Sequence, residues 1–309
     1  MIISREINKP ISIENPVVTI GSFDGVHNAH VQIIKRINEI AKSINGNSVI
    51  ITFHPHPRLV LKHNNDYKFN LLTTTDEKAD LLEKLGLDYL IIVPFTSEFS
   101  TWSAEEFVDK ILVKLIKARK IVIGYNHKFG RDRSGDIGFL KQKGSIYGFD
   151  VESISKQAID KINISSTEIR KLLYNGNICD ASKLLGHSYF FEGVVVKGKQ
   201  IGTKINFPTA NIDIDHESKL IPREGVYAIK AMVNDKTLKG MLHIGQKPTL
   251  TDMTFSIEAN LFDFNENIYG KKIKIFFLEF IRNNFKFDNI QLLKKQLNND
   301  KAKALSILE

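Results

Sequence analysis

Apolar positions in the first half of the chain follow two alternating patterns. Short runs rich in β-branched residues predict strands, and the segments between them, with apolar residues three and four positions apart, predict amphipathic helices. The predicted strands are Val17–Phe23, Ser48–Phe53, Tyr89–Pro94, Lys120–Gly124 and Val151–Ile154. The predicted helices are Val31–Ser43, Asp76–Leu85 and Ala104–Lys117. Such alternation is typical of βαβ units, so we expect an α/β domain with a doubly wound, Rossmann-like parallel sheet.

Beyond about Gly186 the pattern changes to strands separated by glycine-containing turns, with one late helix. The predicted strands are Tyr189–Val196, Lys204–Ile212, Gly225–Val233, Lys239–Ile244, Phe255–Leu261 and Ile273–Ile281, and the predicted helix is Asn289–Leu297. We expect a mainly antiparallel six-stranded β-barrel followed by this C-terminal helix, because closure leaves no exposed strand edge. A chain of 309 residues usually forms two domains, which we place at residues 1–186 and 187–309.

Composition and charge bound the class of protein. The hydrophobic content of 42% suits globular packing, and the longest apolar runs are far shorter than a bilayer span of about 20 residues. The single cysteine, Cys179, cannot form an internal disulfide, and the N-terminal segment lacks the apolar stretch of a secretory signal. We therefore expect a cytoplasmic protein without a membrane partner. The net charge of +8 is scattered along the chain, so it is compatible with nucleotides or nucleic acid and selects neither.

The segment TIGSFDGVHNAHVQII, residues 19–34, leads from a predicted strand through a loop into a helix with two histidines. Ligands of open α/β sheets lie beyond the carboxyl ends of strands, and a helix N-terminus attracts phosphate. His27 and His30 are three positions apart, so both could donate to phosphate oxygens from one face of the helix. A metal pair or two structural histidines are the alternatives. The loop residues that favour the nucleotide site are Gly21, Phe23, Asp24 and Gly25.

Two later segments also suit a phosphate site. GYNHKFGRDRSGD, residues 124–136, joins glycines to basic residues and is typical either of a loop that closes over a nucleotide or of an ordinary exposed loop. SSTEIR, residues 165–170, predicts a helix capping box, which alone would explain its serine and glutamate, although its hydroxyls and Arg170 could also hold a triphosphate. The candidate nucleotide contacts in these segments are Asn126, Arg131, Ser165, Ser166 and Thr167.

In the second half, GVVVKGKQIGTKINFPTANI, residues 193–212, combines glycines with hard oxygen ligands. The glycines allow a backbone tight enough to wrap phosphates, and Thr209 and Asn211 offer the neutral oxygens that Mg²⁺ accepts. A β-hairpin with glycine turns is the alternative. Further on, Glu258 alternates with apolar residues on a predicted strand, as either a solvent-facing residue or a general base would.

These motifs, taken in order, resemble the bifunctional bacterial riboflavin kinase/FAD synthetase family over nearly the whole chain. G-x-F-D-G-x-H with a second histidine resembles the nucleotidyltransferase superfamily, and residues 164–170 resemble the ISSTxIR element of bacterial flavin-adenylating enzymes. Residues 193–212 resemble the glycine loop and PTAN motif of riboflavin kinases, and residues 255–273 resemble the segment with their catalytic glutamate. The sequence departs from the family at Ala29, within residues 243–249 and at Asn260.

The resemblance implies two reactions. Glu258 would accept the proton of the riboflavin 5′-hydroxyl as it attacks the γ-phosphate of MgATP, which yields FMN and ADP. His27, His30 and Arg170 would stabilise the transition state in which the FMN phosphate attacks the α-phosphate of a second ATP, which yields FAD and pyrophosphate. Mg²⁺ would lie at Thr209 and Asn211. The implied ATP contacts of the kinase are Gly193, Gly198, Gly202, Phe207 and Pro208.

Two alternatives stay open at this point. One of the two activities could be lost, or the barrel could bind single-stranded nucleic acid, as small barrels with positive charge do. Nucleic-acid modules stack bases on exposed aromatic rings, whereas the barrel phenylalanines mostly alternate as core residues do: Phe190, Phe191, Phe207, Phe276 and Phe277. We therefore expect small-molecule partners and no nucleic acid. The sequence leaves the oligomeric state open.

Overall fold

The computed structural model describes residues 1–61, 69–154, 164–198, 202, 207–214, 216–248 and 253–309. The chain divides into two compact units, Met1–Ser165 and Ser166–Glu309, and each is treated by itself. The helices α8 (Ser166–Tyr174) and α9 (Ile178–Leu185) belong to the second unit, where α9 packs on a strand of the barrel. The assignment of the two activities to residues 1–186 and 187–309 stays a prediction.

The first unit contains the predicted parallel sheet, which confirms the doubly wound α/β class. Its six strands lie in the order β1-β4-β3-β2-β5-β6, and every described pairing is parallel. The strands are β1 (Ile2–Ser4), β2 (Val17–Ile20), β3 (Ser48–His54), β4 (Tyr89–Pro94), β5 (Lys120–Gly124) and β6 (Asp150–Ile154). Periodicity did not predict β1, because a strand of three residues is too short to show alternation.

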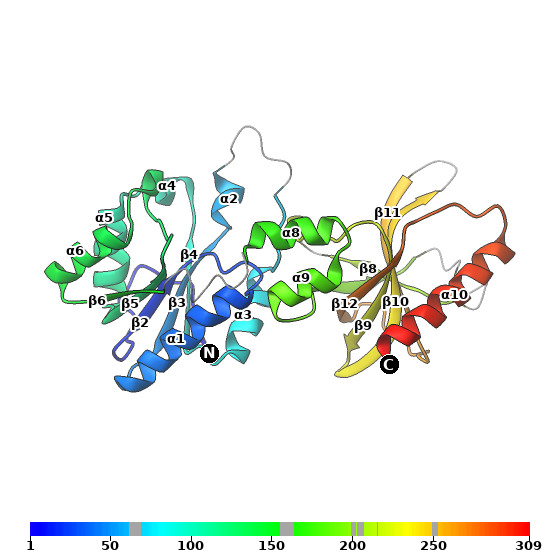
Figure 1. Ribbon diagram of the computed structural model, residues 1–309, viewed down its shortest axis with the longest axis horizontal. Helices are drawn as coiled ribbons and strands as arrows, with labels where there is room; N and C mark the ends of the chain where they lie inside the picture. The colour runs from blue at the N-terminus through cyan, green and yellow to red at the C-terminus, as the bar shows by residue number, and fades with distance from the viewer. Residues whose placement is uncertain (62–68, 155–163, 199–201, 203–206, 215, 249–252) are drawn as a thin grey trace. The chain divides into compact units, whose positions relative to one another are not determined.

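Helices cover both faces of this sheet, as Figure 1 shows. Alternate residues of β3 enter different cores: Ile50 packs with α1 on one face, whereas Val49 and Ile51 pack on the other. The longer helices are α1 (Asn28–Ser43), α3 (Thr75–Lys84), α5 (Ala104–Phe107) with its π-helical continuation η1 (Val108–Leu115), and α6 (Ile137–Tyr147). The short ones are α2 (Pro57–Val60), α4 (Ser97–Ser100) and the 3₁₀ turn η2 (Arg131–Arg133).

The strand β2 ends at Ile20, three residues before its predicted end. Phe23 has a φ of 47° and Val26 a φ of 41°, values in the left-handed region that a strand does not contain. β2 and β5 are neighbours, and the chain continues from β2 to one side of the sheet and from β5 to the other. The loops after these two strands therefore flank the point at which open α/β sheets bind ligands.

The second unit contains the predicted closed barrel of six antiparallel strands, in the order β10-β11-β8-β7-β12-β9. The strands are β7 (Phe190–Val196), β8 (Ala210–Asp213), β9 (Gly225–Val233), β10 (Lys236–Pro248), β11 (Met253–Leu261) and β12 (Lys272–Arg282). The predicted strand Lys204–Ile212 lies partly outside the described residues, and its described part begins only at Ala210. Pro208 cannot donate to a strand ladder, which accounts for this later start.

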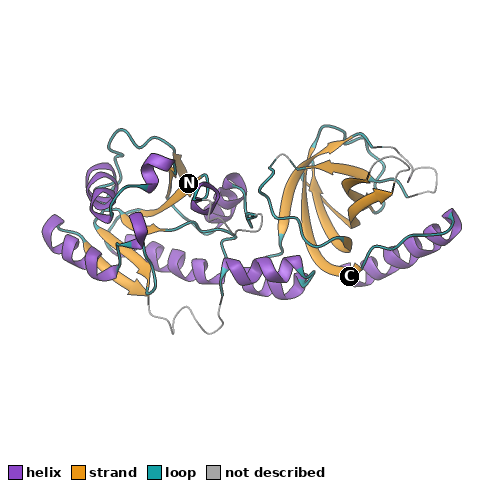
Figure 2. Ribbon diagram, turned by 90° about the horizontal axis from the view of Figure 1, so that it is seen from above, coloured by secondary structure: helices purple, strands orange, loops and turns teal. Residues whose placement is uncertain are grey.

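The C-terminal helix α10 (Ile290–Leu308) lies along the outside of the barrel (Figure 2) and is longer than the predicted Asn289–Leu297. The polar run after Leu297 resembles a helix end in sequence, but Asp300 in that run is 1% exposed and pairs with Arg282 of β12. Ala304 and Leu308 are buried against the barrel beyond it. In the part of the chain that the structure describes, neither α10 nor any other helix combines the length and apolarity that crossing a membrane requires.

Candidate active sites

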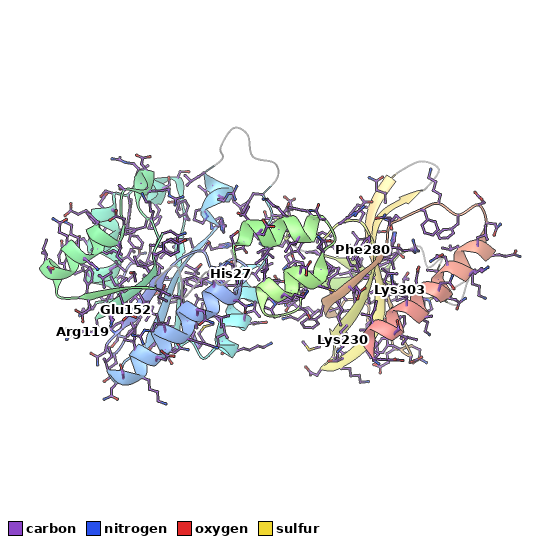
Figure 3. All side chains as sticks on the ribbon, in the orientation of Figure 1. His27, Arg119, Glu152, Lys230, Phe280 and Lys303 are labelled. Atoms are coloured by element: carbon purple, nitrogen blue, oxygen red, sulfur yellow. The ribbon has the colours of Figure 1, made fainter. Side chains whose placement is uncertain are left out.

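The loop from Gly21 to His27 joins β2 to α1 and positions the histidine pair. His27 is the residue that precedes α1, and its side chain makes no capping hydrogen bond to the helix. The two imidazoles stack with ring centroids 3.6 Å apart, and the Phe23 ring lies 4.8 Å from the His30 ring. Figure 3 shows His27 at the N-terminal end of α1. The structure therefore brings together both predicted histidines, the predicted Phe23 and a helix N-terminus that carries no acidic residue.

Burial determines the charge of His30. Burial, followed by the charges of His27 and Lys78, holds the pKa of His30 well below its usual value of 6.5. His30 is therefore a neutral imidazole at pH 7, with one N–H to donate. No hydrogen-bond partner for His30 Nδ1 occurs in the described residues. His30 can thus donate to anionic oxygens. Among the described residues there is no group of three or more His, Cys, Asp or Glu that could hold a metal.

Asp24 connects this loop to the start of α3. Its carboxylate accepts hydrogen bonds from the amides of Leu72 and Thr73 at 3.2 and 3.0 Å, and from the Thr73 hydroxyl at 3.3 Å. The Gly25 amide donates to the same hydroxyl at 3.0 Å. These bonds hold the histidine loop in place. The contacts of Gly21, Phe23, Asp24 and Gly25 with a nucleotide stay predictions.

The loop after β5 carries the predicted Asn126 and Arg131, and both side chains are exposed. This loop is anchored where the Arg131 amide donates to the Trp102 carbonyl at 2.8 Å. Sequence reasoning missed His127, whose Nε2 is buried with no partner among the described residues. Burial, and to a smaller extent Arg133, lowers the pKa of His127 to about 4. The motif GYNHKFG placed this histidine near the site, but no pattern in it predicted burial.

The predicted triphosphate element lies at the junction of the two units. Ser165 ends the first unit, while Ser166, Thr167 and Arg170 lie on α8 of the second. Arg170 is only 8% exposed, and its positive charge acts on the Tyr174 hydroxyl four positions later in α8. The contribution of these residues to adenylyl transfer stays a prediction.

The kinase candidates come together on two neighbouring strands of the barrel. Glu258 on β11 lies opposite Asn211 on β8. Glu258 Oε2 accepts a hydrogen bond from Thr209 Oγ1 at 2.9 Å, and Glu258 Oε1 accepts one from Ser256 Oγ at 3.3 Å. The side chains of Glu258 and Thr209 are half-buried, so they are held in position and still accessible to a ligand.

Glycines fit closely around these oxygens. A β-carbon at Gly198 would overlap the Asn211 amide, and one at Gly202 would overlap the Phe207 carbonyl. Gly193 on β7 has no room for a side chain either, because a β-carbon there would lie 2.6 Å from Ile212 Cγ2. The close approach of the backbone to the segment from Phe207 to Asp213 thus requires the predicted glycines.

Asn260, a departure from the family pattern, proves to be part of this arrangement. It is 7% exposed, and its Nδ2 donates to the Pro208 carbonyl at 2.7 Å. Asn260 lies two residues beyond Glu258 on β11, so the strand that carries the carboxylate also binds the Pro208 segment. The sequence signal was present, since Asn260 and Glu258 share one face of a strand, but the partner Pro208 was not predictable.

Two cavities border the Pro208 segment. One of about 480 Å³ lies between Phe207, Asn260 and α10, with Lys294 and Lys301 on its rim. The second, of about 330 Å³, is lined by Thr209, Ala210 and Tyr269 among others. Both volumes are within the range of small-molecule sites.

Comparison with known proteins bears on both units. The family model described as FAD synthetase matches residues 9–168, and the model described as riboflavin kinase matches residues 185–308. A bifunctional riboflavin kinase/FMN adenylyltransferase of Listeria monocytogenes is 38% identical over 93% of this chain and 90% of its own length. The Bacillus subtilis protein of the same name is 37% identical over 94% of this chain and 91% of its own.

A solved structure agrees in fold. The protein described as a macrolide-efflux protein from Streptococcus pneumoniae superposes with a TM-score of 0.87, at 29% identity and over 97% of each chain. Its name refers to macrolide efflux, which neither matching family model describes. This likeness bears on the fold, whereas the family models and the curated relatives show the family.

Proposed function

The chain belongs to the bifunctional riboflavin kinase/FMN adenylyltransferase family, and on this premise we propose how its residues divide the two reactions. Both family domains are present, so the chain uses ATP to phosphorylate riboflavin to FMN and to adenylylate FMN to FAD. We assign phosphorylation to the barrel around Glu258. We assign adenylylation to the loop that carries His27 and His30.

In the kinase site, Glu258 is the general base. The attacking group is an alcohol, which must lose its proton as the bond to the γ-phosphorus forms and the bond to the ADP oxygen breaks. Hydrogen bonds from Thr209 and Ser256 hold the carboxylate in a fixed orientation. This geometry supports the role, because an oriented carboxylate on a strand accepts a proton without reorganisation.

The donor set beside Glu258 fits Mg²⁺. The Thr209 hydroxyl, the Asn211 amide and the Glu258 carboxylate offer hard oxygen atoms, and Mg²⁺ is commonly held by one or two such groups together with phosphates and water. When bound, Mg²⁺ would neutralise charge on the phosphates of ATP. Thr209 and Asn211 are the residues that would hold it.

In the adenylylation site, the nucleophile is the FMN phosphate, which is already anionic. Its oxygen attacks the α-phosphorus of ATP, and pyrophosphate leaves with the bonding electron pair. No proton has to be removed, so the site requires donors for the charge on the phosphates. His30, held neutral by burial, and the N-terminal amides of α1 supply such donors. The role of Arg170 is carried over from the family motif alone.

The contact of Glu258 with Thr209 opposite Asn211 is the observation that carries the kinase assignment. The test is to give each substrate separately with MgATP and to measure both by-products. Riboflavin should yield ADP, and FMN should yield pyrophosphate without ADP. Release of pyrophosphate from riboflavin without intermediate FMN, or release of neither by-product, would contradict the proposed division.

A further inference from the structure

A buried lysine of the first unit acts electrostatically on His30. Lys78, on α3, is only 5% exposed. Its Nζ donates to Thr52 Oγ1 of β3 at 3.3 Å, and the Thr52 hydroxyl donates to the Ser22 carbonyl at 3.2 Å. One hydroxyl therefore connects the ammonium to the loop that leads into α1.

A second set of hydrogen bonds fixes α3 against this loop. The Asp24 carboxylate accepts from the Leu72 and Thr73 amides, and the Gly25 amide donates to the Thr73 hydroxyl. The Thr74 side chain then caps α3 in a reciprocal capping box with Glu77. The position of Lys78 is thus fixed by the capped start of α3 and by its hydrogen bond to Thr52 of β3.

A buried ammonium costs stability unless a carboxylate compensates it. The hydrogen-bond acceptor of Lys78 is a neutral hydroxyl, and the oxygens of Asp24, whose charge favours the ammonium, accept from the 72–73 backbone. Burial lowers the pKa of Lys78 to about 8, against the opposing effect of Asp24. A methionine would fill the same space without this cost, so packing alone does not explain a lysine here.

We propose that Lys78 is a positioning residue for adenylyl transfer: its buried ammonium, joined through Thr52 to the loop that leads into α1, places a fixed positive charge close to this loop and attracts the nucleotide phosphates. The inference rests on the proposed adenylylation site. It extends that site to a helix, α3, which contributes none of the predicted functional residues. Lys78 acts through the electrostatic field of its ammonium, on the phosphates and on His30, and it requires no contact with the substrate.

The titratable groups around Lys78 act in the expected directions. Asp24 favours its charge, and Lys78 in turn disfavours protonation of His30. Glu77 is occupied as a cap, with its carboxylate accepting from the Thr74 amide at 2.8 Å. His54 at the end of β3 shares a hydrogen bond of 2.9 Å with the Thr75 hydroxyl. His27, like Lys78, disfavours protonation of His30.

The test compares Lys78→Met with Lys78→Arg, and with Lys84→Met as a matched control on the exposed face of the same helix. FAD formation from FMN and MgATP is measured in the full-length protein. Lys78→Met should lower kcat/KM for ATP by roughly tenfold or more, less than the ~10²–10³-fold loss caused by removing a direct donor. Lys78→Arg should retain much of the rate, and Lys84→Met should retain all of it.

The pH profile separates this role from simple packing. In the wild type the ammonium is lost as pH rises through about 8, so kcat/KM for adenylylation should fall above that pH. Lys78→Met should lack this decline, and Lys78→Arg should move it to higher pH. The lowered pKa also means that the folded protein carries the cost of the charge below pH 8 and loses it as pH rises toward 10.5. Lys78→Met should therefore unfold at the same temperature as the wild type or higher at pH 7.

Two results would overturn the inference. One is a Lys78→Met protein with wild-type adenylylation and a wild-type pH profile. The other is a Lys78→Met protein that unfolds at lower temperature and is not rescued by arginine, which would make Lys78 a packing residue. Absence of FAD formation in the wild type would instead refute the proposed adenylylation site itself.

Discussion

The two proposed sites share ATP as cosubstrate but contain different side chains. The loop after β2 leads to the imidazole of His30, which burial keeps neutral, whereas the barrel presents a carboxylate oriented by two hydroxyls. The difference follows from the nucleophile. An alcohol must lose a proton and needs a base, while a phosphate is already an anion and needs only donors around it. The two sites differ because their nucleophiles differ, an alcohol in one and a phosphate in the other, although both use ATP.

The largest effect that tests this difference between the two sites is expected at Glu258. Glu258→Gln keeps the size of the side chain and one oxygen that can accept a hydrogen bond but cannot accept a proton, so FMN formation should fall by about 10²–10⁴-fold. Conversion of added FMN to FAD should be unchanged. Both rates are measured in the same protein by chromatography, with Glu224→Gln, an exposed glutamate of the same unit, as the control. Full kinase activity in Glu258→Gln would exclude this glutamate as the base.

The reciprocal change is His30→Asn, which removes the buried imidazole but leaves a smaller polar group. Adenylylation should fall by about 10²–10³-fold, because a donor to the phosphates is lost, and FMN should accumulate from riboflavin. His187→Asn, in the second unit, is the control. A variant that still makes FAD at the wild-type rate would assign the imidazole a structural role.

A stability prediction concerns the barrel alone. Asp300 is 1% exposed and bonds to Arg282 Nε and NH2 at 2.8 to 3.0 Å. Asp300→Asn leaves the Arg282 guanidinium without its charge partner and should destabilise the second unit by about 3 kcal/mol. Urea unfolding followed by the kinase rate measures this effect. An unchanged midpoint would mean that solvent compensates Arg282.

The smallest expected effect is at Asn260. Asn260→Ala removes the hydrogen bond that holds the Pro208 carbonyl and should lower the kinase rate about tenfold through misplacement of the adjoining Thr209. Asn260→His, which keeps an N–H donor at this position, should recover part of the loss. Asn283→Ala, an exposed asparagine of the same unit, serves as the control. Equal rates for the wild type and Asn260→Ala would show that the segment holds its place without this bond.

The sequence predicted the elements whose patterns are local and long. The parallel strands and the barrel strands follow from alternation, whereas the pairing of Glu258 with Asn211 on neighbouring strands is seen only in the structure. Features that depend on tertiary partners were not predictable. The sequence of the C-terminal half of α10 is polar, and only the contact of Asp300 with Arg282 shows that this half packs on the barrel. Lys78 likewise has the sequence context of an exposed helix residue, and only the packing of α3 against β3 shows that it is buried.

The measurement that tests the central claim most directly is a time course of the wild-type protein with riboflavin, ATP and Mg²⁺, with riboflavin, FMN and FAD separated by chromatography. Two sites that act in sequence predict that FMN appears first and that FAD follows as FMN declines. FMN without FAD would contradict the assignment of the histidine loop, and formation of neither product would contradict the account as a whole.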